Sequence, residues 1–142
     1  MFNVSVNKNE ISVSNKPKSH PKVRENKGQS IIDFTLDYVV IDIETTGFDP
    51  YYDAIIELSA IRIINNIQVE HFSSLVKTTK SVSNFITELT GISNDMLSKA
   101  PIIKDILPQF YEFIGDSVIV GQNVNFDINF IYDNLMNCVN KG

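Results

Sequence analysis

The sequence predicts one α/β domain in which helices flank a mixed β-sheet, and three observations lead to that fold class. Segments of strand and helix character follow one another in the order β-β-β-α-β-α. An Asn-Asn pair between two apolar, β-branched runs predicts a hairpin, so part of the sheet must be antiparallel. The length of 142 residues and the hydrophobic share of 43% are typical of a single globular domain with a sizeable core.

The first 33 residues differ from the rest of the chain in charge. They hold six Lys and Arg against three Asp and Glu, a balance of +3, whereas residues 34–142 hold six against fourteen, a balance of −8. Because a stretch rich in Lys, Asn and Ser cannot bury a core, we expect a flexible basic arm over residues 1–33 and the folded domain over residues 34–142. The arm is a solvated tail or helps to hold nucleic acid. The acidic domain argues against a module held on DNA by a broad basic surface.

Three strands open the domain. The first covers residues 38–47, and the second and third cover residues 54–64 and 67–77, which are apolar and β-branched. Asn65 and Asn66 separate the second strand from the third. Asparagine tolerates positive φ angles, so this pair predicts a tight turn between antiparallel strands.

The second half of the domain is mainly helical. We expect short helices at residues 83–89 and 94–98, a longer helix at 102–114, a short buried strand at 117–120 and a final helix at 126–139. Pro108 lies inside the longer helix. It indicates either a kink or a helix that starts near Asp105, with the proline in the first turn.

Two acidic residues stand out in the first strand, which reads Y-V-V-I-D-I-E-T-T-G. Asp42 and Glu44 are two residues apart, so their side chains share one face of the strand, while Ile41 and Ile43 face the other. Two adjacent carboxylates repel each other and lose solvation unless a cation lies between them. Hard divalent cations such as magnesium or manganese suit these ligands. The alternative is a strand end at which both acids simply reach solvent.

A second chemical segment, V-G-Q-N-V-N-F-D, lies between the fourth strand and the last helix. Asn125 can cap this helix, which places Asp127 in its first turn. The helix dipole favours negative charge there, typically by about 0.3–1 kcal/mol. Asp127 is therefore either a metal ligand or an acid that only stabilises the start of the helix.

Taken together, D-x-E-T-T-G and the later N-x-x-F-D resemble the DEDD family of 3′–5′ exonucleases, in its DEDDh form. The segments Y-D-A-I-I-E-L-S-A-I-R-I and I-T-E-L-T-G-I-S-N-D-M-L between them are similar to the same family. The resemblance covers residues 37–140 and is greatest to the proofreading exonuclease of bacterial DNA polymerase III, as an epsilon-type subunit or a domain embedded in the polymerase. It implies a ribonuclease H-like fold.

The resemblance also implies roles for individual residues. Asp42, Glu44 and Asp127 match three catalytic acids that bind two Mg²⁺ or Mn²⁺ ions. The residues implied in binding the terminal nucleotide are Thr45, Thr46, Phe85, Thr90 and Asn123. For the three threonines, ordinary turn chemistry is an equal alternative. The implied substrate is the 3′ end of single-stranded DNA, with RNA as the alternative, and the implied protein partner is a DNA polymerase or another replication protein.

Two departures from the family pattern matter. Gln122 stands where the family usually has a histidine, and the third motif, a histidine followed five residues later by an aspartate, is absent. The two histidines, His20 and His71, are followed at that distance by Glu25 and Val76. We therefore expect the front part of an exonuclease domain, truncated at its C-terminus, that is inactive or weakly active in this 142-residue form.

Two other functions remain open at this point. The segment D-I-E-T-T mimics the acid pair of haloacid dehalogenase-type phosphatases, although their second acid is an aspartate. A non-catalytic remnant of an exonuclease, which binds nucleic acid or a polymerase, would also explain the missing motif. The single Cys138 excludes an internal disulfide, and no apolar run approaches membrane-spanning length, so we expect a cytoplasmic protein without membrane contact.

Overall fold

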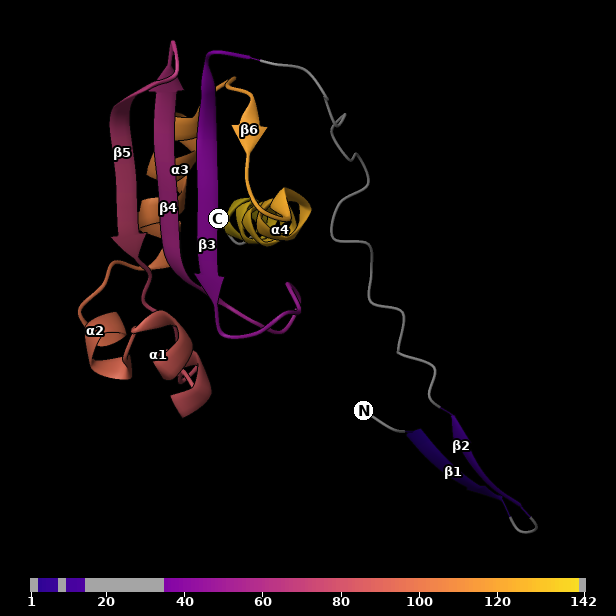
Figure 1. Cartoon of the computed structure of the whole chain (residues 1–142). Coiled ribbons are helices and arrows are strands. Elements are labelled where there is room, and N and C mark those ends of the chain that lie inside the picture. The colour runs from indigo at the N-terminus through magenta and orange to yellow at the C-terminus, as the bar shows by residue number, and fades with distance from the viewer. Residues whose placement is uncertain (1–2, 8–9, 15–34, 141–142) are drawn as a thin grey trace.

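The computed structural model describes residues 3–7, 10–14 and 35–140, and the side chains of residues 35–138. Its folded domain contains, in chain order, β3 (Tyr38–Thr45), β4 (Ile55–Ile64), β5 (Ile67–Leu75), α1 (Asn84–Thr90), α2 (Asn94–Ser98), α3 (Ile103–Ile114), β6 (Ile119–Val120) and α4 (Val124–Asn140) (Figure 1). Within these described ranges, no helix is both long enough and apolar enough to cross a membrane.

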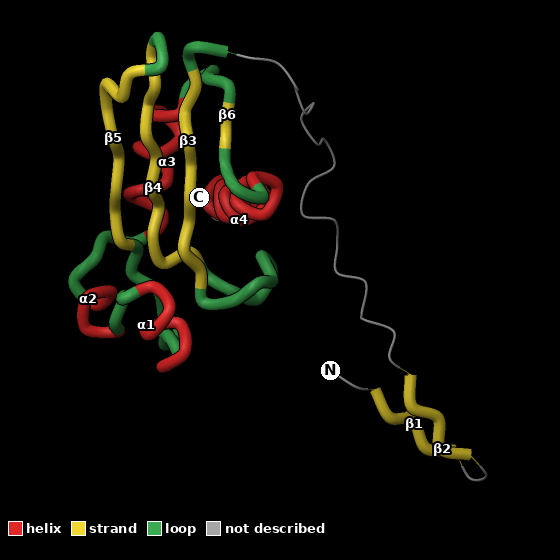
Figure 2. The backbone as a smooth tube through the Cα atoms, in the orientation of Figure 1, coloured by secondary structure: helices red, strands yellow, loops and turns green. Residues whose placement is uncertain are grey.

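The four strands form one mixed sheet in the order β5-β4-β3-β6 (Figure 2). β3 and β4 are antiparallel, as are β4 and β5, while β6 joins β3 in parallel. This arrangement confirms the predicted mixed sheet flanked by helices.

The turn between β4 and β5 confirms the hairpin prediction. Asn65 and Asn66 have φ angles of 51° and 61°. Left-handed conformations at both central residues are the mark of the tight turn whose twist matches the flanking strands. The segment before β3 holds the turn in place, because Asn66 N donates to the Leu36 carbonyl oxygen (3.1 Å) and Asn65 N donates to Asp37 Oδ1 (2.9 Å).

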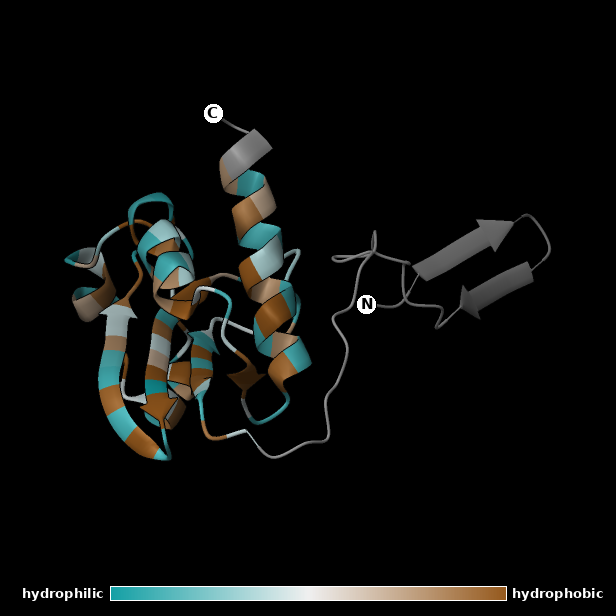
Figure 3. Ribbon diagram, turned by 90° about the horizontal axis from the view of Figure 1, so that it is seen from above, coloured by the Kyte–Doolittle hydropathy of each residue, from teal (hydrophilic) through white to brown (hydrophobic). Residues whose placement is uncertain are grey.

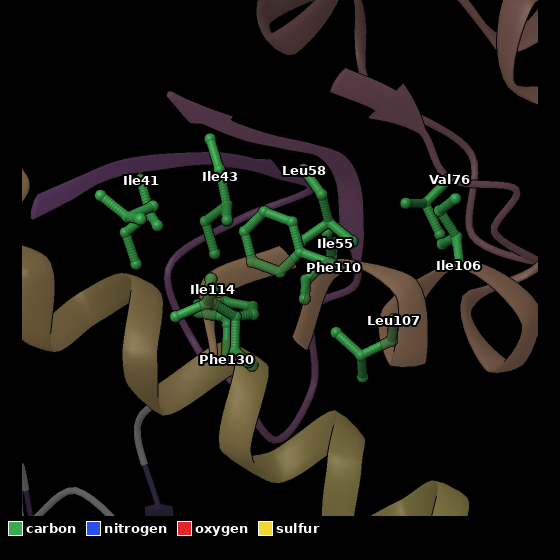
Figure 4. Close-up of a cluster of buried hydrophobic side chains, with 13 residues drawn as sticks. Ile41, Ile43, Ile55, Leu58, Val76, Ile106, Leu107, Phe110, Ile114 and Phe130 are labelled. Atoms are coloured by element: carbon green, nitrogen blue, oxygen red, sulfur yellow. The ribbon is translucent and has the colours of Figure 1, made fainter. Parts of the chain in front are cut away.

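The main core lies between the sheet and helices α3 and α4 (Figure 4). Apolar and polar residues alternate along the strands, as the bands of hydropathy in Figure 3 show, and the apolar ones form the sheet side of this core. In β3, Ile41 and Ile43 are only 2% and 6% exposed, whereas Asp42 between them is exposed. Phe110 of α3 and Phe130 of α4 are completely buried opposite the strands.

A β-bulge divides this core from a smaller one. Glu44 pairs with Glu57 but the next residue, Thr45, pairs with Ile55, so Ile56 is an extra residue on β4. The extra residue shifts the alternation of side chains along β4 by one position. Ile55 therefore joins Leu58 in the main core, while Ile56 joins a second cluster with Val82, Ile86, Ile92 and Leu97. This second cluster holds α1 and α2 at the end of the sheet where β3 ends (Figure 1).

Two helix starts differ from the predictions. α3 begins at Ile103, so the alternative start near Asp105 is wrong, and Pro108 lies inside the helix. α4 begins at Val124, two residues earlier than predicted, which places Asn125 inside the first turn instead of at the N-cap. The cause is Asn123, whose φ of 57° reverses the chain and whose carbonyl oxygen accepts from Phe126 N (2.8 Å).

The N-terminal arm contains two strands that the sequence analysis did not predict. β1 (Asn3–Asn7) and β2 (Glu10–Ser14) pair with each other in antiparallel register. The missed signal is alternation, because Val4 and Val6 lie opposite Val13 and Ile11. Residues 1–2, 8–9 and 15–34 lie outside the described ranges, so the flexibility of the arm stays a prediction.

Candidate active site

The candidate site lies where the short strand β6 ends and leaves the edge of β3 open. β6 pairs only with Val39 and Val40 of β3. Further along the strand, Ile43 N donates to Asp127 Oδ1 at 3.1 Å. Between β6 and α4 the chain passes close to β3 at Gly121. A Cβ at this residue would lie 3.0 Å from the Ile41 carbonyl oxygen, so glycine allows the close approach. Close approach of the backbone after β6 therefore brings the first turn of α4 against the edge of β3.

This contact places the third predicted acid next to the first two. Asp42 and Glu44 come from β3, on the face of the strand opposite Ile41. Asp127 comes from α4 and is only 3% exposed, whereas Asp42 is exposed and Glu44 is half-buried. The negative charges of both strand acids act on Asp127. The three acids are thus neighbours, although 83 residues separate Glu44 from Asp127 in the sequence.

The electrostatics of Asp127 show that its charge is poorly compensated. The pKa of Asp127 is raised from 3.8 to about 6, and burial is the largest cause. Hydrogen bonds from its own backbone N–H and from Ile43 N oppose the increase. The charges of Asp42 and Glu44 add to it. Burial also raises the pKa of Glu44, with further contributions from Asp42 and Glu57. In the part of the chain whose side chains are described, the ion pairs are Arg62–Glu70 and Lys99–Asp95, which involve none of these acids. A bound cation would supply the missing charge.

A fourth acid, which the sequence analysis did not single out, faces this site from β4. Glu57 is half-buried and directly opposite Glu44 in the strand register. Burial, and then the charge of Asp42, raise the pKa of Glu57. Like charges directly opposite each other destabilise a sheet, so this pair also favours a cation nearby. The available signal was an acid inside the apolar run I-I-E-L, but the register between β3 and β4 was needed to identify Glu44 as its partner.

The donor chemistry of the site fits magnesium or manganese, because all its side-chain ligands are carboxylate oxygens. In the conformation described, however, no three acidic, histidine or cysteine side chains among residues 35–138 are grouped closely enough to hold a metal ion. Asp127 is held by Ile43 N, while Asp42 lies at the surface. The residues therefore fit the metal in their donor chemistry, and the convergence of all three carboxylates on one cation stays a prediction.

The two threonines that follow the acids are bound within their own loop. The Thr45 hydroxyl donates to the Gly47 carbonyl oxygen. The Thr46 hydroxyl donates to Asp53 Oδ1 (3.1 Å) and accepts from Ala54 N (3.0 Å). A Cβ at Gly47 would lie 2.4 Å from Asp53 Oδ2, so the loop depends on glycine there. These contacts favour the turn-chemistry alternative for both hydroxyl groups.

The remaining predicted nucleotide-binding residues lie on α1 and before α4. Thr90 closes the C-terminal end of α1, where its hydroxyl donates to the Ile86 carbonyl oxygen (2.8 Å) and accepts from Ile92 N (3.1 Å). Phe85 is 66% exposed on α1. Asn123 is exposed beside the start of α4. Turn chemistry therefore accounts for the Thr90 hydroxyl, while Phe85 and Asn123 remain accessible to a ligand.

An exposed aromatic side chain beside the acids was also missed. Phe48 directly follows the T-T-G segment and is 85% exposed. Its ring lies edge-on to Phe126, with 6.5 Å between the ring centroids, and Phe126 in turn contacts Phe130. Phe126 immediately precedes Asp127, so Phe48 lies next to the candidate site. An aromatic residue directly after the acidic strand was the available signal.

A mixed sheet with acids at the end of its central strand, closed by a helix that brings another acid, defines a ribonuclease H-like nuclease. The solved nuclease domain of 3′hExo, a DEDDh family member bound to rAMP, has this fold, with a TM-score of 0.60 at 19% identity over 72% of this chain and 60% of that chain. The chain belongs to the exonuclease family, whose model, RNase_T (Exonuclease), matches residues 39–141. This result confirms the resemblance found in the sequence and does not support the phosphatase alternative.

Bacterial replication proteins are among the relatives. The chain is 45% identical over 103 residues to a PolC-type DNA polymerase III of Clostridium perfringens, covering 72% of this chain and 7% of the relative. It is 43% identical over 114 residues to the DNA polymerase III subunit epsilon of Aquifex aeolicus, covering 80% of this chain and 55% of that subunit. The chain thus spans a small part of the first relative and about half of the second.

A solved structure of Exonuclease X in complex with 5′ overhanging duplex DNA is also similar. It matches with a TM-score of 0.57 and 27% identity, over 66% of this chain and 52% of that chain.

Proposed function

We propose that this chain is a metal-dependent 3′–5′ exonuclease domain that removes nucleotides from the 3′ end of single-stranded DNA, with RNA as the alternative substrate. The observation that supports it most is the contact of Asp127 with Ile43 N, between the strand acids Asp42 and Glu44. Family membership supplies the reaction class. The similarity to DNA polymerase III proteins suggests a proofreading or repair role beside a polymerase or another replication protein in the cytoplasm.

In this proposal Asp42, Glu44 and Asp127 hold two Mg²⁺ or Mn²⁺ ions. When bound, the metal ions supply an activated water and stabilise the leaving 3′ oxygen. The Ile43 backbone N–H fixes Asp127 through Oδ1. Because burial opposes its ionisation, Asp127 would bind as a carboxylate only with a cation nearby, which would favour its charged form.

A positioned general base is the part of the mechanism that the described residues do not supply. His71 lies on β5 opposite Ile61, where it is exposed. His20 lies outside the described ranges. Loss of a general base typically lowers a rate by about 10²–10⁴-fold. We therefore propose that the 142-residue chain by itself has little activity.

The terminal nucleotide would bind beside the acids and toward α1. Phe85 and Phe48 offer exposed aromatic rings, and Asn123 offers an exposed amide. The hydroxyls of Thr45 and Thr46 already hold the loop, so these residues would act mainly by shaping the pocket.

The experiment is a digestion assay with 5′-labelled single-stranded DNA and Mn²⁺. It would use the 142-residue chain. We expect a faint ladder of products shortened from the 3′ end that EDTA abolishes. Asp42→Asn should remove it, whereas Asp116→Asn, an exposed acid before β6, should not.

Each of the other outcomes has a distinct meaning. Strong digestion by the 142-residue chain, lost in Asp42→Asn, would show that no further base is needed. No digestion by the chain, despite metal binding, would favour the non-catalytic remnant. Hydrolysis of p-nitrophenyl phosphate in place of DNA would favour a phosphatase.

A further inference from the structure

One arginine of β4 reaches across the helix-facing side of the sheet toward β6. Arg62 lies directly opposite Val39 of β3, and Val39 in turn lies opposite Ile119 of β6. Val39 is completely buried in the main core, so this row of residues faces the helices. The Arg62 side chain therefore lies on the face of the sheet that α3 covers (Figure 1).

The guanidinium group of Arg62 binds both α3 and the segment that leads into β6. Nη2 donates to the Phe113 carbonyl oxygen in the last turn of α3, and Cζ lies 5.0 Å from the centroid of the Phe113 ring. Nη1 donates to the Ser117 hydroxyl oxygen (3.0 Å). Nε donates to Glu70 Oε2 of β5 (3.0 Å). Because each nitrogen has its own partner, the planar group is held in one orientation.

The strand that follows this segment is short. β6 spans two residues, whereas strands in globular proteins usually have about five or six. Its ladder with β3 consists of the pairs Val39–Ile119 and Val40–Val120, next to a hydrogen bond from Val39 N to the Val118 carbonyl oxygen (2.9 Å). With so short a ladder, the position of β6 depends strongly on what holds the chain just before it, which is the contact between Arg62 and Ser117.

The position of β6 determines where the first turn of α4 meets β3. Asp127 follows the end of β6 by seven residues. Within them, Gly121 passes close to the β3 backbone, and Asn123 reverses the chain with a φ of 57°. This compact connection transmits a shift of β6 to Asp127, whose Oδ1 accepts from Ile43 N at 3.1 Å. A hydrogen bond weakens quickly when its geometry is disturbed.

We infer that Arg62 is a positioning residue for Asp127. By holding the entry to β6, it keeps the first turn of α4 where Ile43 N binds the Asp127 carboxylate. The inference rests on the proposed function for the role of Asp127 as a metal ligand. It gives Arg62 an influence on metal affinity although its ion pair is with Glu70 and not with the acids of the site.

The test compares two variants that each alter one side of the Arg62 contacts. Ser117→Ala removes the acceptor at the entry to β6, whereas Glu70→Gln, the matched control, changes the partner on β5. Amide hydrogen exchange, followed by NMR in EDTA, reports on the Ile43 N–H. In Ser117→Ala this amide should exchange about fivefold faster or more, as expected when a hydrogen bond is lost, while the amides of β4 and β5 stay unchanged. In Glu70→Gln the Ile43 amide should exchange as in the unchanged chain.

Mn²⁺ affinity supplies the second measurement. Arg62→Gln removes the whole guanidinium group, and we expect it to weaken Mn²⁺ binding by about tenfold or more, as residues that support metal ligands do. Circular dichroism would identify a temperature at which this variant is fully folded, and the titration would be done there. Ser117→Ala should weaken binding in the same direction but by less, because two of the three Arg62 hydrogen bonds remain.

Several results would overturn the inference. An unchanged Ile43 amide in Ser117→Ala, or equal acceleration of every amide in the sheet, would mean that Arg62 only stabilises the fold. Equal Mn²⁺ affinity of Arg62→Gln and the unchanged chain would have the same meaning. The exchange measurement needs neither metal nor substrate. Faster exchange at Ile43 in a chain that binds no Mn²⁺ would therefore contradict the proposed function while supporting the positioning by Arg62.

Discussion

Two neighbouring parts of the molecule, both at the end of β3, treat their carboxylates in opposite ways. In the loop, Asp53 accepts a hydrogen bond from the Thr46 hydroxyl and another from a backbone N–H. At the strand edge, burial is the largest cause of the raised pKa of Asp127, and the charges of Asp42 and Glu44 add to it, so that the hydrogen bonds from Ile43 N and from its own backbone N–H do not offset the increase. The loop therefore stabilises its acid with partners from the chain, whereas the edge gathers acids that oppose one another.

The difference separates residues that maintain the fold from residues prepared for a ligand. A buried polar group that finds its partners within the protein stabilises the native state, while an uncompensated buried charge lowers stability until something binds. Functional sites commonly contain groups whose pKa is shifted in this way. On this view the hydroxyl groups of Thr45 and Thr46 stabilise the loop, whereas Asp42, Glu44 and Asp127 form a site for a cation.

The largest effect is expected at Asp127. Its folded pKa of about 6 exceeds its ordinary value of 3.8. The contribution of Asp127 to the free energy of unfolding is therefore fully present below about pH 4 and is lost as the pH rises to about 6. Asp127→Asn keeps an acceptor for Ile43 N but removes the charge. In EDTA, urea denaturation should show a gain of up to about 3 kcal/mol near pH 8 and almost none near pH 4.

Asp116→Asn is the control for that experiment and should change little at either pH. A loss of stability near pH 8 in Asp127→Asn would mean that the buried carboxylate is well compensated. The contrast between the loop and the strand edge would then fail.

A smaller loss is expected on the loop side of the comparison. In Gly47→Ala the new Cβ would lie 2.4 Å from Asp53 Oδ2, so the carboxylate must move and give up hydrogen bonds. We expect a loss of about 1–3 kcal/mol in the free energy of unfolding, measured by urea denaturation.

The double variant Gly47→Ala/Asp53→Ala checks the cause of that loss. If the clash with the carboxylate is responsible, Gly47→Ala should cost much less when Asp53 is already absent. Equal costs in both backgrounds would show that the glycine matters for another reason, and that Asp53 does not organise the loop.

The smallest effect is expected from the N-terminal arm. Deleting residues 1–33 should leave the thermal midpoint unchanged within measurement error, because the arm offers few apolar side chains to the domain. Differential scanning calorimetry of both proteins would test this. A midpoint lowered by many degrees would mean that the arm, including β1 and β2, packs on the domain and belongs to its stable part.

Local sequence patterns were sufficient for much of the fold. Alternation placed Asp42 and Glu44 opposite the buried Ile41, and Asn65-Asn66 gave the hairpin turn. The order of the elements gave the mixed sheet. These features depend on residues close together in the chain, which is why pattern reasoning found them.

Features that depend on distant residues or on unusual backbone conformations were missed. The left-handed Asn123 moved the start of α4, and the register between β3 and β4 placed Glu57 opposite Glu44. The position of Asp127 at the open edge of β3 follows from where β6 ends, and the sequence indicated it only through the family resemblance. The threonine hydroxyls were assigned to neither alternative until their partners in the loop were known.

The central claim is that Asp42, Glu44 and Asp127 together hold a divalent cation. The most direct measurement is a titration of the metal-free chain with Mn²⁺, in which the electron paramagnetic resonance signal of unbound Mn²⁺ is followed. We predict binding by the unchanged chain and by Asp116→Asn, and a loss of affinity beyond about 100-fold in Asp42→Asn, because ligands matter more than their supporting residues. Asp42→Asn should unfold at the same urea concentration as the unchanged chain or a higher one. Equal Mn²⁺ binding by the unchanged chain and Asp42→Asn, or no binding by either, would contradict the claim.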